Sequence, residues 1–273
     1  MMLAVVGDLV EDVVVWLDRP LQVGTDNPAR VFRSRGGSAA NVAVLAARAV
    51  PTRFIGRVGD DPLGDHLIQA LRKAGVDARV QRGGRTGSIV VLVDADGERT
   101  MLPDRAASAE LTDVPPAWLD GVTALHVPAY GFPQVDAFVG TAVEKGIRVT
   151  VDASSTAVLE GLGVQAFLDR IREIRPSVLF ANAMEARMLG DNPTGGVLVV
   201  KNGPHPARVV EPGGRVTEVP ARPVERARDS TGAGDAFAAA YLTAMLEGQP
   251  PVECARRGHE LASVVLTTPG AAQ

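Results

Sequence analysis

Short apolar runs alternate with helix-like segments along most of the chain, and this alternation constrains the fold more than any other feature. Residues 3–6 form an apolar run that ends in Gly7-Asp8, which is typical of a buried first strand. Residues 39–50 favour a helix, 53–58 a strand and 63–74 another helix. Later apolar runs, again alternating with helical segments, are 124–127, 149–151, 178–180 and 197–200. Strands that alternate with helices predict an α/β fold with a parallel sheet covered on both faces.

Two segments, 12–35 and 87–102, interrupt this alternation and are typical of β-hairpins. In the second, an apolar run over 88–93 leads into a turn signal at 94–97 that contains two aspartates and a glycine. We expect these segments to form a small sheet beside the main one, and such a flap can cover a substrate and exclude water. The alternative is a pair of edge hairpins with no mobile role.

Composition narrows the class of protein. The chain has 273 residues, enough for one large domain or two small ones, and no repeat or flexible linker divides it. A net charge of −4 gives no basic surface for nucleic acid. No apolar stretch is long enough to span a membrane, and an acid at position 8 comes too early for a signal peptide. The single cysteine, Cys254, excludes an internal disulfide and favours a cytoplasmic location.

The motif DSTGAGD at residues 229–235 is the most specific chemical signal in the chain. A small apolar segment that favours a helix, residues 236–242, follows it. A glycine-bearing turn that opens into a helix leaves backbone N–H groups unpaired, and these donors together with the helix dipole attract anions. A carboxylate is unexpected at a site that attracts anions. Its presence at Asp235 is explained if it takes a proton from a hydroxyl that attacks a phosphoryl group. The alternative is an ordinary glycine turn with an acid in the first turn of a helix.

Two weaker signals lie elsewhere. Gly36 and Gly37 let a backbone approach a ligand closely, and Asn41 offers a donor and an acceptor to sugar hydroxyls, although a plain turn and helix start explains them equally well. Asn182 and Glu185 follow the strand 178–180 at a spacing that puts both on one helix face. They are interpreted as a helix cap, as a site for Mg²⁺ held by Glu185 through water, or as both.

Several blocks of the sequence resemble the signatures of the ribokinase-like (PfkB) carbohydrate and nucleoside kinases. The DSTGAGD motif resembles their C-terminal signature, and residues 36–43 resemble their N-terminal one. Residues 56–64 resemble a further family block, and 182–185 resemble an Asn-x-x-Glu motif. The blocks extend over nearly the whole chain in the family's order, and they do not choose a substrate.

The resemblance implies a single kinase domain over 1–273, with a three-layer α/β/α fold, a mostly parallel central sheet and a small β-sheet lid formed by about 12–35 and 87–102. It implies ATP as the donor and Mg²⁺ as the metal. Asp235 would be the catalytic base, and the backbone amides of Gly232, Ala233 and Gly234 would form the anion hole. The acceptor would be bound by Asp12, Gly36, Gly37 and Asn41, and ATP by Asn182, Glu185, Lys201, Gly203 and His259.

The resemblance also indicates a monovalent cation, usually K⁺, at Asp229 and Thr231. The early chain end at Gln273 departs from many relatives and leaves the second segment of that loop, near Gly270, in question. The segment 152–155 departs from the usual pattern as well, and no role is assigned to it.

The sequence favours an ATP-dependent kinase of a small sugar or sugar acid, such as ribose, fructose or 2-keto-3-deoxygluconate. Arg99 or Arg105 can meet an anionic group on the acceptor, or can be solvated. A nucleoside kinase of the adenosine type is an alternative, with Trp16 and Phe32 as candidates for base stacking. A non-catalytic sugar-binding protein on the same fold is another. A further alternative is a dinucleotide-dependent oxidoreductase. The sequence argues against it, because the first predicted strand is not followed by the Gly-x-Gly-x-x-Gly fingerprint of that class. The open edges of the lid hairpins suggest a homodimer.

Overall fold

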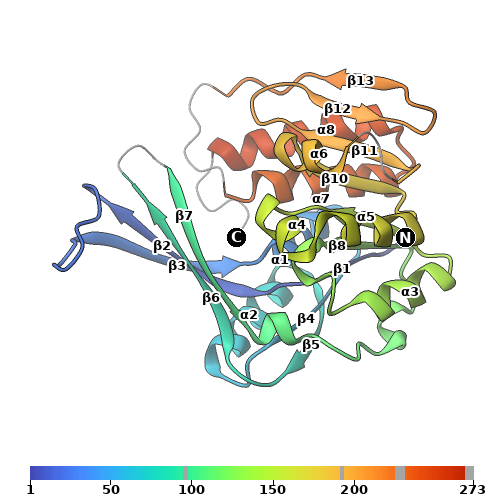
Figure 1. Ribbon diagram of the computed structural model, residues 1–273. Coiled ribbons are helices and arrows are strands. Elements are labelled where there is room, and N and C mark those ends of the chain that lie inside the picture. Colours follow the sequence, from blue (N-terminus) through green and yellow to red (C-terminus); the bar gives the residue numbers. More distant parts are fainter. Residues whose placement is uncertain (95–97, 191–193, 225–230, 268–273) are drawn as a thin grey trace.

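The computed structural model describes residues 1–94, 98–190, 194–224 and 231–267. Within these residues the larger sheet has nine strands in the order β13-β12-β11-β10-β9-β8-β1-β4-β5 (Figure 1). All neighbours from β5 to β11 are parallel, and β12 and β13 are added antiparallel at one edge. The strands are β1 (Leu3–Val6), β4 (Thr52–Val58), β5 (Asp77–Arg82), β8 (Ala124–Pro128), β9 (Arg148–Asp152), β10 (Val178–Asn182), β11 (Val197–Lys201), β12 (Ala207–Val210) and β13 (Val216–Val219).

Helices cover both faces of this sheet, as the alternation predicts. The buried side chains of α1, α2, α7 and α8 pack on one face, and those of α3, α4, α5 and α6 pack on the other. The helices are α1 (Ser38–Ala47), α2 (Pro62–Lys73), α3 (Asp136–Glu144), α4 (Thr156–Leu162), α5 (Val164–Ile174), α6 (Ala183–Leu189), α7 (Ala233–Leu246) and α8 (Pro251–Thr267). Three short 3-10 segments are η1 (Ala107–Glu110), η2 (Pro116–Leu119) and η3 (Ala129–Gly131). The predicted helix over 39–50 therefore ends earlier, at Ala47, and the antiparallel edge β12–β13 was not predicted.

The two interrupting segments form a separate four-stranded sheet in the order β3-β2-β6-β7. Its strands are β2 (Val10–Leu17), β3 (Ala29–Gly36), β6 (Thr86–Val93) and β7 (Arg99–Ala106). Each predicted hairpin is antiparallel, and the two are joined by a parallel pairing of β2 with β6. In Figure 1 this sheet projects from the side of the larger α/β body.

The carboxyl ends of the central strands meet at one edge of the large sheet. The register places Pro128 beside Asp152 and Asn182 beside Lys201, so the last residues of β8, β9, β10 and β11 lie near one another. Ligands bind outside the carboxyl ends of the strands in open α/β sheets, because backbone groups and loops converge there. Among the described residues, no helix is both long and apolar enough to cross a bilayer.

Candidate active site

A cavity of about 910 Å³ opens between the carboxyl edge of the large sheet, the start of α7 and the small sheet. Most of the residues predicted to bind ligands line it. They are Asp12, Gly37, Asn41, Asn182, Glu185, Lys201, Gly203, Thr231, Gly232, Ala233, Gly234, Asp235 and His259. Gly36 adjoins this set, and the candidate cation ligand Asp229 lies outside the described residues, as does Gly270. Segments far apart in the sequence thus contribute to one space.

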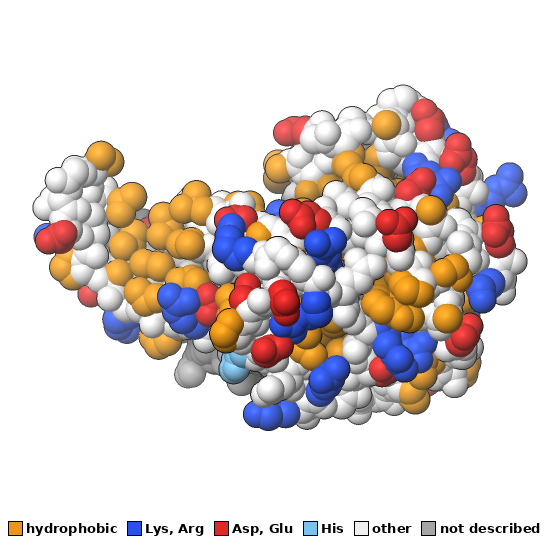
Figure 2. All heavy atoms as spheres, turned by 90° about the horizontal axis from the view of Figure 1, so that it is seen from below, with side chains coloured by type: hydrophobic (Ala, Val, Ile, Leu, Met, Phe, Trp, Pro, Cys, Tyr) orange, Lys and Arg blue, Asp and Glu red, His pale blue; other side chains and the backbone are white. Residues whose placement is uncertain are grey.

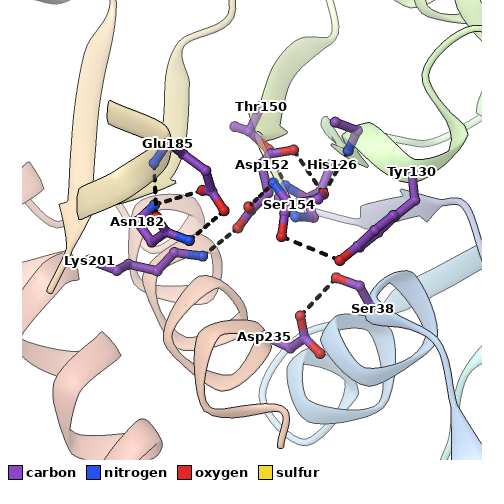
Figure 3. Close-up of polar contacts among 11 residues, drawn as sticks. Ser38, His126, Tyr130, Thr150, Asp152, Ser154, Asn182, Glu185, Lys201 and Asp235 are labelled. Carbon is purple, nitrogen blue, oxygen red and sulfur yellow. Dashed lines mark hydrogen bonds and ion pairs between the residues drawn. The ribbon is translucent and has the colours of Figure 1, made fainter. Parts of the chain in front are cut away.

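Asp235 lies in the first turn of α7, and its carboxylate is held by two neutral donors. The Ser38 hydroxyl donates to Oδ1 at 2.7 Å and the Asn41 amide donates to Oδ2 at 2.8 Å (Figure 3 shows the Ser38 bond). The helix starts after Gly232, whose left-handed backbone (φ 75°) turns the chain into α7. Burial raises the pKa of Asp235 to about 6, although both hydrogen bonds act to lower it. The group is therefore ionised at neutral pH and more basic than an ordinary carboxylate.

Two glycines allow α1 to start close to the small sheet. A Cβ on Gly37, whose φ is 101°, would lie 2.5 Å from the backbone oxygen of Asp8. A Cβ on Gly36 would lie 2.1 Å from Oδ1 of Asp12, so only glycine leaves room for that carboxylate. The pair therefore positions Asp12 and the helix that carries Asn41.

Arg35 fixes the orientation of Asn41, a contact that the sequence patterns do not predict. Its Nη1 donates to Asn41 Oδ1 at 2.9 Å, so the amide nitrogen of Asn41 is directed at Asp235. Burial lowers the pKa of Arg35 to about 10, while the charges of Asp12 and Asp235 favour the cation. The sequence signal for this contact is an arginine immediately before the Gly36-Gly37 pair.

Lys201 and Asp152 form a nearly buried ion pair on the cavity floor. Nζ of Lys201 lies 2.6 Å from Oδ2 of Asp152, and their side chains are 18% and 10% exposed (Figure 3). Burial opposes the charge on Lys201, but attraction by Asp152 leaves its pKa above the usual value. A Cβ on Gly234 would lie 3.5 Å from Nζ, so the ammonium group also lies close to the start of α7. Asp152 had been assigned no role; an acid at the end of a buried strand was the signal.

His126 and Thr150 lie near this pair, and the charges of Asp152 and Lys201 both act on the His126 ring. The buried His126 ring contacts Thr150 Oγ1 through Nδ1 at 3.0 Å, and burial lowers its pKa to about 4. The imidazole is therefore neutral at physiological pH.

Asn182 and Glu185 form a capping box at the start of α6, as one interpretation of the sequence predicted. Asn182 Oδ1 accepts from the backbone N–H of Met184 and of Glu185, at 2.8 and 2.9 Å. Glu185 Oε2 accepts from the backbone N–H of Asn182 at 2.7 Å, and Oε1 accepts from the Asn182 amide. Burial raises the pKa of Glu185. The cap holds an acidic side chain at the cavity wall, beside Asp152 and Lys201.

His259 lines the cavity but is tied to the protein. Its Nε2 lies 3.2 Å from the backbone oxygen of Val219, and its ring meets Phe237 edge-on at 5.1 Å between centroids. Burial lowers its pKa, so it is neutral at pH 7. His259 therefore offers a flat, uncharged surface where α7 and α8 face the cavity.

Comparison with known proteins identifies the family. A family model described as "pfkB family carbohydrate kinase" matches residues 2–273. The chain belongs to the pfkB family of carbohydrate kinases. This pfkB-family protein is accordingly an ATP-dependent carbohydrate kinase, and the dinucleotide-dependent oxidoreductase alternative is excluded.

Relatives of this pfkB-family kinase are named for different acceptors. It is 31% identical to an ATP-dependent ribose-1-phosphate kinase of Halopiger xanaduensis, with 88% of this chain and 83% of the relative covered. It is 30% identical to a fructokinase of Klebsiella pneumoniae, with 94% and 89% covered. Its fold matches the crystal structure of adenosine kinase from Sinorhizobium meliloti with a TM-score of 0.86 at 21% identity, covering 98% and 94%. The ribokinase-like fold implied by the sequence is confirmed, with a mostly parallel large sheet and a smaller separate one.

Proposed function

We propose that this kinase transfers the γ-phosphoryl group of ATP to a hydroxyl of a small sugar or sugar acid, with Asp235 as the general base. The observation that carries the proposal is the Asp235 carboxylate at the N-terminus of α7, inside the cavity and held by Ser38 and Asn41. A carboxylate with a pKa of about 6 accepts a proton more readily than a solvated one and is still ionised at pH 7.

The N-terminus of α7 supports the proposal that the phosphoryl group is stabilised during its transfer. Phosphoryl transfer depends on in-line placement and on stabilising charge at the equatorial oxygens. The backbone N–H groups of Gly232, Ala233 and Gly234 belong to a helix N-terminus, where the first donors have no partner within the helix. Lys201 adds a positive charge near the same point. In this proposal Ser38 and Asn41 hold the Asp235 carboxylate in place while it takes the hydroxyl proton.

The acceptor is proposed to occupy the side of the cavity formed by Asp12, Gly37 and Asn41, with Gly36 making room for Asp12. The two relatives are named for a sugar phosphate and for a free sugar, so they leave the charge of the acceptor open. The nucleoside alternative has less support. Trp16 and Phe32, its candidates for base stacking, are not among the described residues that line the cavity.

The donor side is proposed to include Asn182, Lys201, Gly203 and His259, with Glu185 and Asp152 facing Mg²⁺ through water. Within the described part of the chain, no three His, Cys, Asp or Glu side chains form a complete metal cage. Two hard-oxygen groups beside a lysine fit Mg²⁺, which keeps several waters and shares its ligands with phosphates. When bound, the ion would neutralise charge on the phosphate oxygens. Replacing Glu185 by Gln should raise the Mg²⁺ concentration for half-maximal velocity about 10-fold, and no change would remove Glu185 from this role.

A K⁺ ion is also proposed, with Thr231 and Asp229 as candidate ligands, the second of them outside the described residues. The decisive assay measures ADP formation from Mg²⁺-ATP with a panel of sugars, sugar acids, sugar phosphates and nucleosides, with and without K⁺. We expect ADP release that depends on one class of sugar. Absence of acceptor-dependent ADP release across the panel would contradict the proposed function.

The small sheet is proposed to be the lid of a single kinase domain spanning 1–273, and to pair with its copy in a homodimer. Three apolar side chains of β3 and β7 support the pairing because each is more than half exposed and none lines the cavity: Val31, Phe32 and Leu102. Figure 2 shows hydrophobic side chains gathered over the projecting sheet. Sedimentation at micromolar concentration should give the mass of a dimer, and a monomer mass would exclude the pairing. A cytoplasmic location remains a prediction from the sequence.

A further inference from the structure

Arg105 brings a positive charge to the acceptor side of the cavity. It lies near the end of β7, and the alternation of side chains along that strand puts Arg99, Met101, Pro103 and Arg105 on the cavity wall. Arg105 is partly buried, so its charge is only partly screened by solvent.

The guanidinium of Arg105 is held in place by an aromatic ring. Its Cζ lies 4.3 Å from the centroid of the Tyr130 ring, and the Tyr130 hydroxyl donates to the backbone oxygen of Ser154 at 3.3 Å. A cation held over a ring face in this way does not use its N–H groups as hydrogen-bond donors to the ring. Tyr130 thus orients Arg105 without satisfying its donors.

One hydrogen-bond donor of Arg105 has no partner in the part of the chain that the structure describes. Its Nε is buried without a hydrogen bond, and across the described residues its side chain forms no ion pair. Arg85, next to β6, shows the contrast, because it pairs with Asp104 at 2.5 Å in an exposed position. A buried donor without a partner costs stability, and binding an anion would remove that cost. The contact with Tyr130 explains where Arg105 lies, but not why its Nε has no hydrogen-bond partner.

Arg105 lies where we expect the end of the acceptor that is opposite the reacting hydroxyl. In Figure 3, Tyr130 and Lys201 lie on opposite sides of Asp235. Arg105 lies over the Tyr130 ring and so on the Tyr130 side of the cavity, whereas ATP is proposed to bind on the Lys201 side. A molecule with its reacting hydroxyl at Asp235 would direct its other end toward Arg105.

We propose that the acceptor carries an anionic group, a phosphate or a carboxylate, that Arg105 binds while the reacting hydroxyl lies at Asp235. This inference rests on the proposed function. Arg105 is thereby a specificity-determining residue, because a neutral sugar would leave its buried donor unpaired. A guanidinium suits both groups, since its planar fork donates two parallel hydrogen bonds to a carboxylate or a phosphate.

The test compares acceptors in pairs that differ only in the charged group, one pair with a phosphate and one with a carboxylate. For the unaltered kinase we expect kcat/KM at least 10-fold higher for the charged member of one pair. Arg105→Gln should lower kcat/KM for that member by about 10²-fold, the scale of a hydrogen bond to a charged group, and change the neutral member by less than about threefold. Arg105→Lys should restore part of the loss. Arg85→Gln is the matched control and should change neither value.

The outcomes separate the two proposals. Equal use of charged and neutral acceptors by the unaltered kinase, or an equal effect of Arg105→Gln on both, would overturn the anionic acceptor and leave the kinase assignment standing. If no acceptor supports ADP release, the proposed function fails. Calorimetric binding of the charged and neutral sugars to the unaltered protein and to Arg105→Gln then decides the role of Arg105. Should the Gln variant not fold, the comparison of acceptors on the unaltered kinase is decisive by itself.

Discussion

Lys201 Nζ lies 2.6 Å from Asp152 Oδ2, a bond between the ends of two strands that are not neighbours in the sheet. The strand β10 separates them, so the pair spans the carboxyl ends of three strands. Both groups are largely shielded from solvent, and attraction by Asp152 favours the charged form of Lys201. The pair places one positive charge close to the start of α7, where the anion is proposed to bind.

Lys201→Met should lower the free energy of unfolding by about 3 kcal/mol, because Asp152 would be left as a nearly buried, unpaired carboxylate. The double variant Lys201→Met/Asp152→Asn should be more stable than Lys201→Met alone. The exposed pair Lys145–Asp120 is the control, and Lys145→Met should cost less than about 1 kcal/mol. Denaturant unfolding measures all of these. Equal effects at the two lysines would contradict the importance of the buried pair.

Asp235→Asn should lower kcat by about 10²-fold or more, because the amide cannot take the hydroxyl proton. Asp65→Asn is a matched control, since Asp65 is also an acid in the first turn of a helix but lies outside the cavity. It should leave kcat within about twofold of the unaltered value. Rates come from ADP release at saturating substrates. Near-normal turnover in Asp235→Asn would refute the base assignment.

The pH profile of kcat/KM should show an acidic limb near pH 6, because Asp235 must be ionised and burial raises its pKa to about 6. Ser38→Ala removes a hydrogen bond that lowers this pKa, so the limb should move to higher pH. A limb that stays in place would show that another group controls the profile.

The same raised pKa affects folding. The folded state binds the Asp235 proton more tightly than the unfolded state, whose carboxyl titrates near its usual pKa of 3.8. The contribution of this group to stability is therefore present at low pH and is lost as pH rises toward about 6. Asp235→Asn should remove that part of the pH dependence, as followed by unfolding experiments between pH 4 and 7. An unchanged dependence would contradict the shift.

Asn182→Ala should lower the free energy of unfolding by about 1 kcal/mol, because two backbone N–H groups at the start of α6 lose their acceptor. Asn182→Asp keeps an acceptor oxygen but sets a second carboxylate beside Glu185, so it should recover only part of the loss. Chemical denaturation distinguishes the two variants. If Asn182→Ala is as stable as the unaltered protein, the cap has no energetic role.

Gly258→Ala should destabilise the protein by about 1–3 kcal/mol, because its Cβ would lie 2.9 Å from the Phe237 ring where α8 packs on α7. Gly140→Ala is the control in another helix, where the nearest atom would be 4.0 Å away. It should raise stability by up to about 1 kcal/mol. Thermal unfolding measures whether each variant is more or less stable than the unaltered protein. A Gly258→Ala variant that is more stable would show that α7 and α8 accommodate the added methyl group without cost.

Local sequence patterns predicted much of the architecture. Each apolar run from 3–6 to 197–200 is a strand of the large sheet, and both hairpin segments form the small sheet. These patterns succeed because burial on both faces requires continuous apolar runs, and turns require particular residues. The edge strands β12 and β13 escaped prediction because neither is a continuous apolar run: Arg208 interrupts β12, and β13 is largely exposed.

Local residue patterns specify the order of strands and helices and the glycine turn before α7. They also indicate a cap at the start of α6 as one interpretation, because Asn182 and Glu185 are only three residues apart. Three contacts of the site arise only when the whole chain is folded: Asn41 binds Asp235 from 194 residues away, Arg35 orients Asn41, and Lys201 pairs with Asp152. These contacts depend on how α1, α7 and the strand ends pack. Packing of this kind is a property of the whole hydrophobic core, and no local segment encodes it.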